Sequence, residues 1–250
     1  MKILCIGNSF SQDATHYLHQ IARSNGDDFQ IANLYIGGCP LEKHFRNMHS
    51  DERAYNLMFN GQTTYFMVSI KEALLNRSWD VVTVQQASPS SPKPETYTPY
   101  GEELVAYVRK LCPKAKVIVH QTWAYEDGSP KLLDLMGYPT HDAMFADIEN
   151  AYASFAASVD AYGIIPAGKL MQSMLKNGIE KVHRDTFHLS LGIGRYAAAL
   201  TWYKMLTGAD VSDISFNDFD VPVSDEEITL AKSAVNEICG EYLEKVILPF

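Results

Sequence analysis

The chain has 250 residues, 46% of them hydrophobic, and this is enough for one sizeable core, so we expect a single domain over residues 1–250. A formal net charge of −9, without any run of Lys or Arg, argues against a nucleic acid or an anionic membrane as a partner. No stretch of about 18 uninterrupted apolar residues occurs, which predicts no membrane span. The four cysteines are far apart in the sequence, so we expect no disulfide framework, no metal site and no cofactor.

The first residues form a short apolar run that predicts a strand, Ile3–Ile6. This run holds too few apolar residues before Gly7 for the core of a signal peptide. We therefore expect a cytoplasmic protein, unless an export signal preceded the sequence.

Farther along, short apolar runs alternate with segments of helical periodicity, a pattern typical of βα units that build a parallel sheet. The expected strands are Ile3–Ile6, Gln30–Leu34, Asp80–Val84, Lys116–His120 and Gly163–Pro166. Apolar residues at helical spacing predict helices around residues 14–22, 104–111, 144–155 and 228–242. Ser224 and Glu227 have the spacing of a capping box before the last helix, and Gly208 is expected to end the helix before it.

Two segments depart from this alternation. Tyr55–Ser69 contains Asn60-Gly61 between two polar-aromatic runs, which is a strong signal for an inserted hairpin. Ala87–Pro99 is rich in proline and directly follows the third strand, so it predicts a loop. Loops in that position line the ligand crevice at the carboxyl edge of a parallel sheet.

A serine stands where the first strand gives way to the first helix, in Gly7-Asn8-Ser9-Phe10-Ser11. A hydroxyl in that position is exposed at the sheet edge, close to backbone N–H groups and to the positive end of a helix dipole, which stabilise a developing anion. Taken by itself, the segment is also compatible with serines that only cap the helix.

The second notable segment is Asp185-Thr186-Phe187-His188. On a turn, a carboxylate three residues before a histidine can accept the Nδ1–H of the ring, which leaves Nε2 free to accept a proton from a serine. For this segment alone, an Asx-type turn with a surface histidine is the alternative. His183 and Arg184, which precede the turn, could bind a carboxylate of the substrate or have no function.

Together, the serine after the first strand and the late DxxH segment resemble the SGNH/GDSL hydrolase superfamily, and the resemblance extends over essentially the whole chain. It implies a flavodoxin-like α/β/α sandwich of three layers, with a central five-stranded parallel sheet to which the hairpin is added. It also implies that Ser9 is the nucleophile, that His188 is its base, and that Asp185 orients the histidine.

The resemblance further implies an oxyanion hole formed by the backbone N–H groups of Ser9 and Gly38, with Gly37 setting the turn. Where the family has an asparagine after the third strand, this chain has Gln85-Gln86, and a glutamine amide offers the same donors on a longer stem. Neighbouring strand residues point to opposite faces, so only one of the two is expected to serve. This variant pattern is similar to a branch of SGNH-like proteins common in gut bacteria.

The expected reaction is hydrolysis of a small ester, and the family analogy suggests an O-acetyl or short acyl group on a carbohydrate-like substrate. Further residues considered for substrate binding are Gly37, His44, Trp123 and Tyr125. Purely structural roles are the alternative for the last three, His44 as a histidine on a helix surface. Two other functions remain open: a non-catalytic module that binds a sugar or phosphate, and a metal-dependent phosphoesterase or transferase that uses Asp13 and Asp185.

Overall fold

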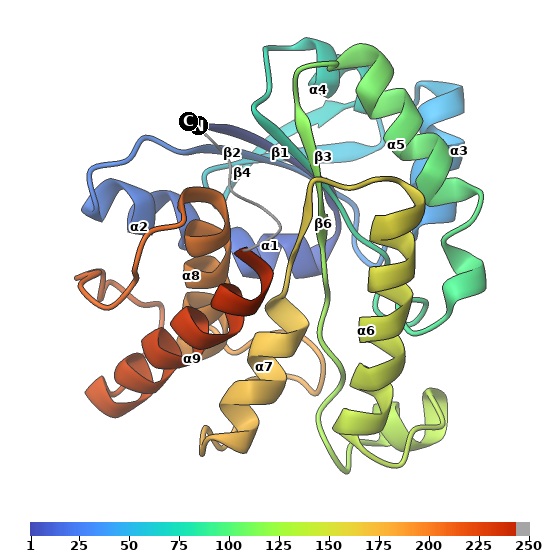
Figure 1. Cartoon of the computed structure of the whole chain (residues 1–250). Coiled ribbons are helices and arrows are strands. Elements are labelled where there is room, and N and C mark those ends of the chain that lie inside the picture. Colours follow the sequence, from blue (N-terminus) through green and yellow to red (C-terminus); the bar gives the residue numbers. More distant parts are fainter. Residues whose placement is uncertain (244–250) are drawn as a thin grey trace.

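The computed structural model describes residues 1–243, so residues 244–250 of the expected domain lie outside the described residues. A seven-stranded sheet runs through the molecule in the order β4-β3-β2-β1-β5-β6-β7, with helices on both faces (Figure 1). The strands are β1 (Lys2–Gly7), β2 (Gln30–Tyr35), β3 (Tyr55–Phe59), β4 (Gln62–Val68), β5 (Val81–Val84), β6 (Lys116–His120) and β7 (Gly163–Ile165).

The five strands expected from the apolar runs are confirmed as β1, β2, β5, β6 and β7, which pair in parallel. The central strand β1 is buried from its second residue onward, as continuous apolar runs are when helices cover both faces of a parallel sheet. Ile6 near the end of β1 is level with Leu34 on β2 and Val84 on β5, so the carboxyl ends of the three strands lie side by side.

The inserted hairpin is confirmed, but it belongs to the central sheet, which is therefore mixed rather than limited to five parallel strands. Its first strand, β3, pairs antiparallel with β2. Asn60 and Gly61 form the turn with φ angles of 48° and 83°, the left-handed conformations that a tight hairpin turn requires. The hairpin covers the hydrogen-bonding edge that β2 would otherwise expose.

The outer strand of the hairpin, β4, contains an irregularity. Met58 pairs with Thr63 and Asn56 pairs with Met67, so one residue of β3 faces three residues of β4. Within this bulge, Tyr65 has a φ of 61°, and its side chain is 82% exposed. The β4 edge is thus bent at its middle.

The helices form the two outer layers, with α3, α5 and α6 on one side of the sheet and α1, α2 and α8 on the other (Figure 1). Helices α7 and α9 pack against α8. Their bounds are α1 (Ser9–Thr15), α2 (Leu18–Ser24), α3 (Leu41–Ser50), α4 (Ile70–Leu75), α5 (Tyr100–Leu111), α6 (His141–Ser158), α7 (Ala167–Lys176), α8 (Ile193–Thr207) and α9 (Asp225–Leu243). A 3₁₀ turn spans Pro94–Thr96, and a π-helical turn spans Lys131–Leu135.

Three of the four helices expected from periodicity are confirmed as α5, α6 and α9. Ser224 and Glu227 make the reciprocal hydrogen bonds of the capping box before α9. Gly208 ends α8 in the left-handed conformation with a φ of 74°. The prediction of one helix over 14–22 was wrong, because α1 ends at Thr15 and α2 begins at Leu18.

Tertiary hydrogen bonds are made at this break. The hydroxyl of Tyr17 donates to the carbonyl of Leu191 at 2.6 Å and accepts from the backbone N–H of Asp220 at 2.9 Å. Both partners come from the last quarter of the chain, which the local apolar spacing does not register. The break anchors the first helical segment to the segment that follows the DxxH turn.

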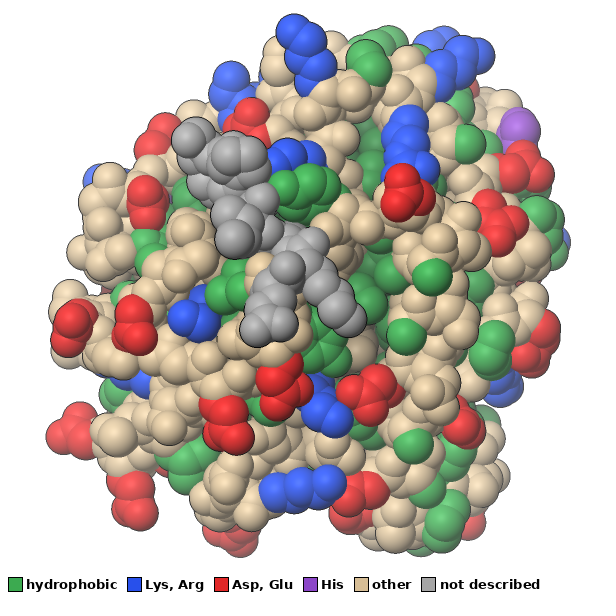
Figure 2. Space-filling view, in the orientation of Figure 1, with side chains coloured by type: hydrophobic (Ala, Val, Ile, Leu, Met, Phe, Trp, Pro, Cys, Tyr) green, Lys and Arg blue, Asp and Glu red, His purple; other side chains and the backbone are tan. Residues whose placement is uncertain are grey.

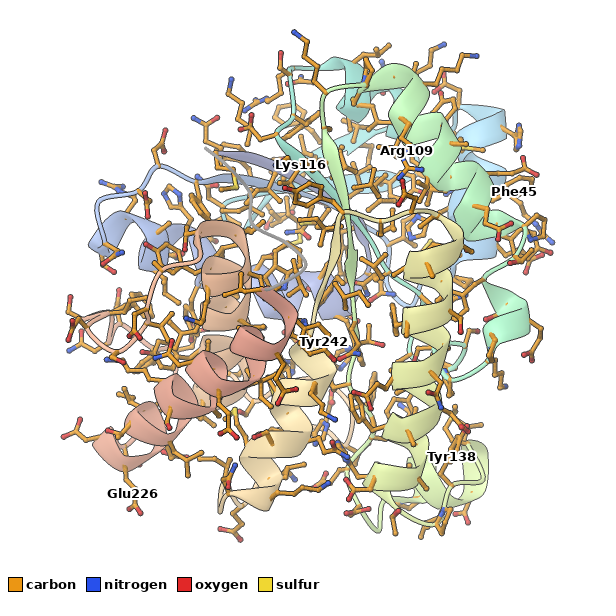
Figure 3. All side chains as sticks on the ribbon, viewed as in Figure 1. Phe45, Arg109, Lys116, Tyr138, Glu226 and Tyr242 are labelled. Atoms are coloured by element: carbon orange, nitrogen blue, oxygen red, sulfur yellow. The ribbon has the colours of Figure 1, made fainter. Side chains whose placement is uncertain are left out.

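The orientation of the sheet can be followed in Figure 3, where Lys116, at the start of β6, lies near the upper end of the molecule. Tyr138, in the segment after β6, lies at the lower end, so the carboxyl end of β6 points downward in this view.

Within residues 1–243, no helix is both long enough and apolar enough to cross a membrane. On the face in Figure 2, Lys and Arg side chains are dispersed among acidic ones.

Candidate active site

Ser9, His188 and Asp185 form a continuous hydrogen-bonded row at the carboxyl edge of the sheet. The Oγ of Ser9 lies 2.9 Å from Nε2 of His188, and Nδ1 of His188 lies 2.8 Å from Oδ2 of Asp185. These are the distances that a nucleophile, its base and the carboxylate behind the base require. Segments 179 residues apart in sequence meet here at one point.

The turn that carries His188 is held in place by local hydrogen bonds. Oδ1 of Asp185 accepts the backbone N–H of His188 at 2.9 Å, so both carboxylate oxygens bind the same residue. Burial opposes the charge of Asp185, but hydrogen bonds from the ring and backbone of His188 outweigh it and lower the pKa of the carboxyl below its ordinary value. Thr186 has a φ of 77°, a strained conformation for a β-branched residue, of the kind found at functional turns.

A buried carboxylate fixes this turn to the first helix. Asp13, on α1, is fully buried and accepts from Nη1 of Arg184 at 3.0 and 2.9 Å. It also accepts from Nε of Arg195 at 2.9 Å and from the backbone N–H of Leu189 at 3.1 Å. Because Leu189 directly follows His188 and Asp13 lies one helical turn beyond Ser9, this network ties His188 to the helix that carries Ser9.

Two backbone N–H groups at the site, those of Ser9 and Gly38, are available as donors. Oδ1 of Asn8 caps α1 by accepting the N–H of Phe10 at 2.9 Å. Within residues 1–243, the N–H groups of Ser9 and Gly38 have no acceptor. Gly38 has a φ of 61°, a conformation that favours glycine.

A pocket of about 320 Å³ opens at these groups. The residues expected there from the sequence that do line it are Ser9, Gly37, Gly38, Tyr125 and His188. The sequence did not single out the other lining residues, which are Asn8, Phe10, Tyr35, Ser88, Pro89, Lys131, Leu135 and Phe187. Two of these, Ser88 and Pro89, belong to the proline-rich loop that was expected to line the crevice, whereas nothing in the sequence pointed to Lys131 or Leu135.

The two glutamines expected near the oxyanion do not line the pocket, since hydrogen bonds inside the protein occupy both amides. Nε2 of Gln85 donates to Oδ1 of Asn8 at 2.9 Å. Nε2 of Gln86 donates to the carbonyl of Thr96 at 3.0 Å, and its Oε1 accepts from Leu41 N at 3.0 Å. A glutamine side chain is long enough to reach these partners, so each amide makes hydrogen bonds to residues around the site instead of lining the pocket.

His44 and Trp123 also lie outside the pocket. His44 is fully buried on α3, with Nδ1 2.9 Å from the hydroxyl of Tyr55, so it is neither a surface residue nor a pocket residue. Trp123 is fully buried, stacks on Phe10 with ring centroids 4.2 Å apart, and donates from Nε1 to the carbonyl of Phe187 at 2.7 Å. The indole therefore supports Phe10 and Phe187, the residues next to Ser9 and His188.

The residues before the turn have structural contacts as well. His183 is buried and lies 3.0 Å from the carbonyl of Ala124, whereas Arg184 binds Asp13. Asp13 and Asp185 thus have separate partners, an arginine pair for the former and His188 for the latter. Within residues 1–243, no group of three or more His, Cys, Asp or Glu side chains is arranged to hold a metal ion.

We expect the buried histidines to make the protein sensitive to acid. Burial lowers the pKa of His44 and His120 to about 3 and that of His183 to about 4. Below about pH 6.5 the unfolded chain binds protons that the folded chain excludes. The free energy of unfolding should therefore decrease as the pH is lowered. Each histidine contributes at most about 1.4 kcal/mol per pH unit, and urea unfolding at pH 7, 6 and 5 measures the sum.

His44→Gln should reduce the slope of the free energy of unfolding against pH by the equivalent of about one bound proton, whatever it does to stability at pH 7. His49→Gln, on the exposed face of the same helix, is the control for a His-to-Gln change on α3 that removes no buried ring. A free energy of unfolding that is constant between pH 7 and pH 5 would contradict the prediction.

The fold and the Ser9–His188–Asp185 row place the chain in the SGNH/GDSL class of α/β proteins. It belongs to the family described as "Domain of unknown function (DUF4886)", whose model matches residues 2–238. A search of curated proteins found no match.

Solved structures give the same assignment of fold. A DUF4886 family protein from Bacteroides uniformis is 33% identical with a TM-score of 0.89, and the match covers 99% of this chain and 97% of that one. A putative SGNH hydrolase from Slackia heliotrinireducens is 25% identical with a TM-score of 0.59, covering 82% of this chain and 97% of that one. A putative GDSL-like lipase from Parabacteroides merdae, 15% identical with a TM-score of 0.53 and coverages of 81% and 94%, shares the fold.

Proposed function

We propose that the protein is a serine esterase that hydrolyses a small ester through an acyl-enzyme on Ser9. The observation that carries the proposal is the hydrogen-bonded row of Ser9, His188 and Asp185 at the wall of a pocket. The similarity to a putative SGNH hydrolase over most of the chain supports it.

The reaction proceeds in two halves. Nε2 of His188 accepts the proton of Ser9 as Oγ attacks the ester carbonyl, and Asp185 stabilises the imidazolium that forms. The N–H groups of Ser9 and Gly38 donate to the oxyanion of the tetrahedral intermediate. When the intermediate collapses, His188 returns the proton to the leaving alcohol, and a water molecule then releases the acyl group by the same steps.

The proposed oxyanion hole rests on backbone donors alone. Neither Gln85 nor Gln86 contacts the oxyanion in this mechanism, because both amides are already bound to protein groups. Two backbone donors are sufficient for the geometry of such a hole, and each donor is worth about 10²–10³ in rate.

For the substrate we propose an O-acetyl or other short acyl ester on a carbohydrate-like alcohol. The pocket volume of about 320 Å³ is suited to a small group. Tyr35, Tyr125 and Phe187 supply aromatic surface that can pack against a sugar ring or an acyl chain. The net charge of −9 supports a small molecule rather than a nucleic acid or an anionic membrane as the partner.

Labelling with a fluorophosphonate tests the proposal and locates the nucleophile in one experiment. Because the reagent reacts with activated serines, we expect stoichiometric modification of the peptide that contains Ser9 and a large loss of rate in His188→Ala. Ser24→Ala, on α2 and away from the pocket, is the matched control and should label like the wild type.

Labelling of another serine, or of none, would overturn the proposal. A protein that is not labelled, but that a sugar or phosphate stabilises against heat, would instead be a binding module. Ester hydrolysis should also survive EDTA, since no step of the proposed mechanism uses a metal ion; loss of activity in EDTA would favour metal-assisted hydrolysis.

A further inference from the structure

A chain of buried hydrogen bonds crosses the carboxyl ends of four adjacent strands directly beneath the candidate site. Nδ1 of His120 on β6 lies 2.8 Å from Oε1 of Gln85, which follows β5. Nε2 of Gln85 donates to Oδ1 of Asn8 at 2.9 Å, and Nδ2 of Asn8 donates to the carbonyl of Cys39 at 3.2 Å. All four residues are at most 2% exposed, so water does not compete for these bonds.

Two backbone groups fix the direction of every bond in this chain. Oδ1 of Asn8 accepts the N–H of Phe10, so the atom of Gln85 that faces it must be the amide nitrogen. Oε1 of Gln85 then faces His120, whose Nδ1 must carry the proton. At the other end, the Cys39 carbonyl can only accept, which makes Nδ2 of Asn8 its donor.

The position of Gly7 supports a specific role for Gln85. A Cβ on Gly7 would come within 2.9 Å of Oε1 of Gln85 and within 2.6 Å of Oγ of Ser11. Glycine at the end of β1 therefore permits the close approach that brings the amide to Asn8. Burial also lowers the pKa of His120 to about 3, which keeps the ring neutral at working pH.

The last bond of this hydrogen-bonded series, from Asn8 to Cys39, joins the two residues next to the backbone donors of the proposed oxyanion hole. Asn8 directly precedes Ser9, and Cys39 directly follows Gly38. The bond from Asn8 to Cys39 therefore sets the spacing between the Ser9 N–H and the Gly38 N–H. Without Gln85, the side chain of Asn8 would lose the partner that fixes its rotamer.

We propose that Gln85, oriented by His120, is a positioning residue that holds Asn8 and thereby sets the spacing of the two oxyanion donors. The proposal rests on the esterase function proposed above. It gives the glutamine after β5 an indirect role in place of the direct one expected from the sequence.

Gln85→Met, which keeps the length of the side chain but removes both hydrogen bonds, provides the first test. We expect kcat for p-nitrophenyl acetate to fall about 10- to 100-fold while KM changes less than about threefold, because misplaced donors weaken transition-state binding. Affinity for phenylboronic acid, which forms a tetrahedral adduct on an active serine, should fall in parallel with kcat.

Gln85→Glu distinguishes the proposed positioning role from a purely structural one, because the proposed role predicts a pH-dependent kcat. The ionised carboxylate cannot donate to Asn8, whereas the protonated form can donate through its O–H in the geometry of the amide. The ratio of variant to wild-type kcat should therefore rise as the pH falls, with both proteins verified as folded at each pH.

Trp79→Phe is the matched control, because it removes a buried hydrogen bond, from Nε1 to the carbonyl of Ala73, at the opposite end of the sheet. It should lower stability without changing kcat. The proposal is overturned if Gln85→Met retains wild-type kcat and boronate affinity, or if the ratio for Gln85→Glu does not vary with pH. A wild-type protein that no fluorophosphonate labels would instead refute the esterase function itself, so the two failures are distinguishable.

Discussion

Replacement of Ser9 by alanine is expected to lower kcat/KM for p-nitrophenyl acetate by roughly 10⁴–10⁶-fold while the protein stays folded. Among residues 1–243 the hydroxyl makes one hydrogen bond, to His188, so its removal deletes the proposed nucleophile without disturbing the surrounding packing. His188→Ala should have a loss of similar size, because the serine and its base act as a unit. Steady-state hydrolysis at matched folded concentration, verified by circular dichroism, measures both.

Asp185→Asn should lose less activity than either of these variants, about 10³- to 10⁴-fold, since the nucleophile and the base remain and only the orientation and charge behind the ring are altered. Equal rates in the wild type, Ser9→Ala and His188→Ala would refute the assignment of the nucleophile and the base. Rates that respond to His188→Ala but not to Ser9→Ala would place the base correctly and the nucleophile wrongly.

Asp13→Ala is expected to be the most damaging single change outside the pocket. It would leave the guanidinium groups of Arg184 and Arg195 without the buried carboxylate that now accepts from both. Breaking a buried ion pair in this way costs about 3–5 kcal/mol of folding free energy. Activity should fall as well, because the same carboxylate holds the backbone of Leu189, next to His188, the proposed base.

Urea unfolding at pH 7 would measure the loss of stability, with Asp220→Asn as the control. Asp220 also binds Arg195, at 3.0 Å, but its side chain is 43% exposed, so this change should cost less than about 1 kcal/mol. An Asp13→Ala variant as stable as Asp220→Asn would show that the arginines find other partners.

The parts of the fold that depend on local pattern were predictable from the sequence. Each parallel strand is a short apolar run, and Asn60-Gly61 is a turn whose backbone conformation few other residue pairs adopt. The pairing of the hairpin with β2 was not predictable from pattern, because it depends on which sheet edge remains uncovered after the chain folds. The break between α1 and α2 was missed for a similar reason, since the partners of Tyr17 lie far away in sequence.

The candidate site likewise contains residues that local pattern predicts and residues that depend on long-range contacts. Ser9 and the Asp185–His188 turn were identified because each combines a chemically active side chain with a recognisable local setting. The role proposed for Gln85 could not be predicted from its position after β5, because it depends on His120, at the end of β6, and on Asn8, directly after β1. His44 was misplaced because the sequence does not show that Tyr55 and Cys39 close over it.

The bulge in β4 has a consequence for the behaviour of the protein in solution. A straight edge strand with exposed aromatic residues is a template on which another chain can add a strand, and this is a common route to aggregation. Here Tyr65 and Phe66 are exposed on the terminal strand, but the backbone is kinked where they stand, so the ladder cannot continue in register past that point. The irregularity should therefore disfavour the addition of a strand from another chain at Tyr65 and Phe66.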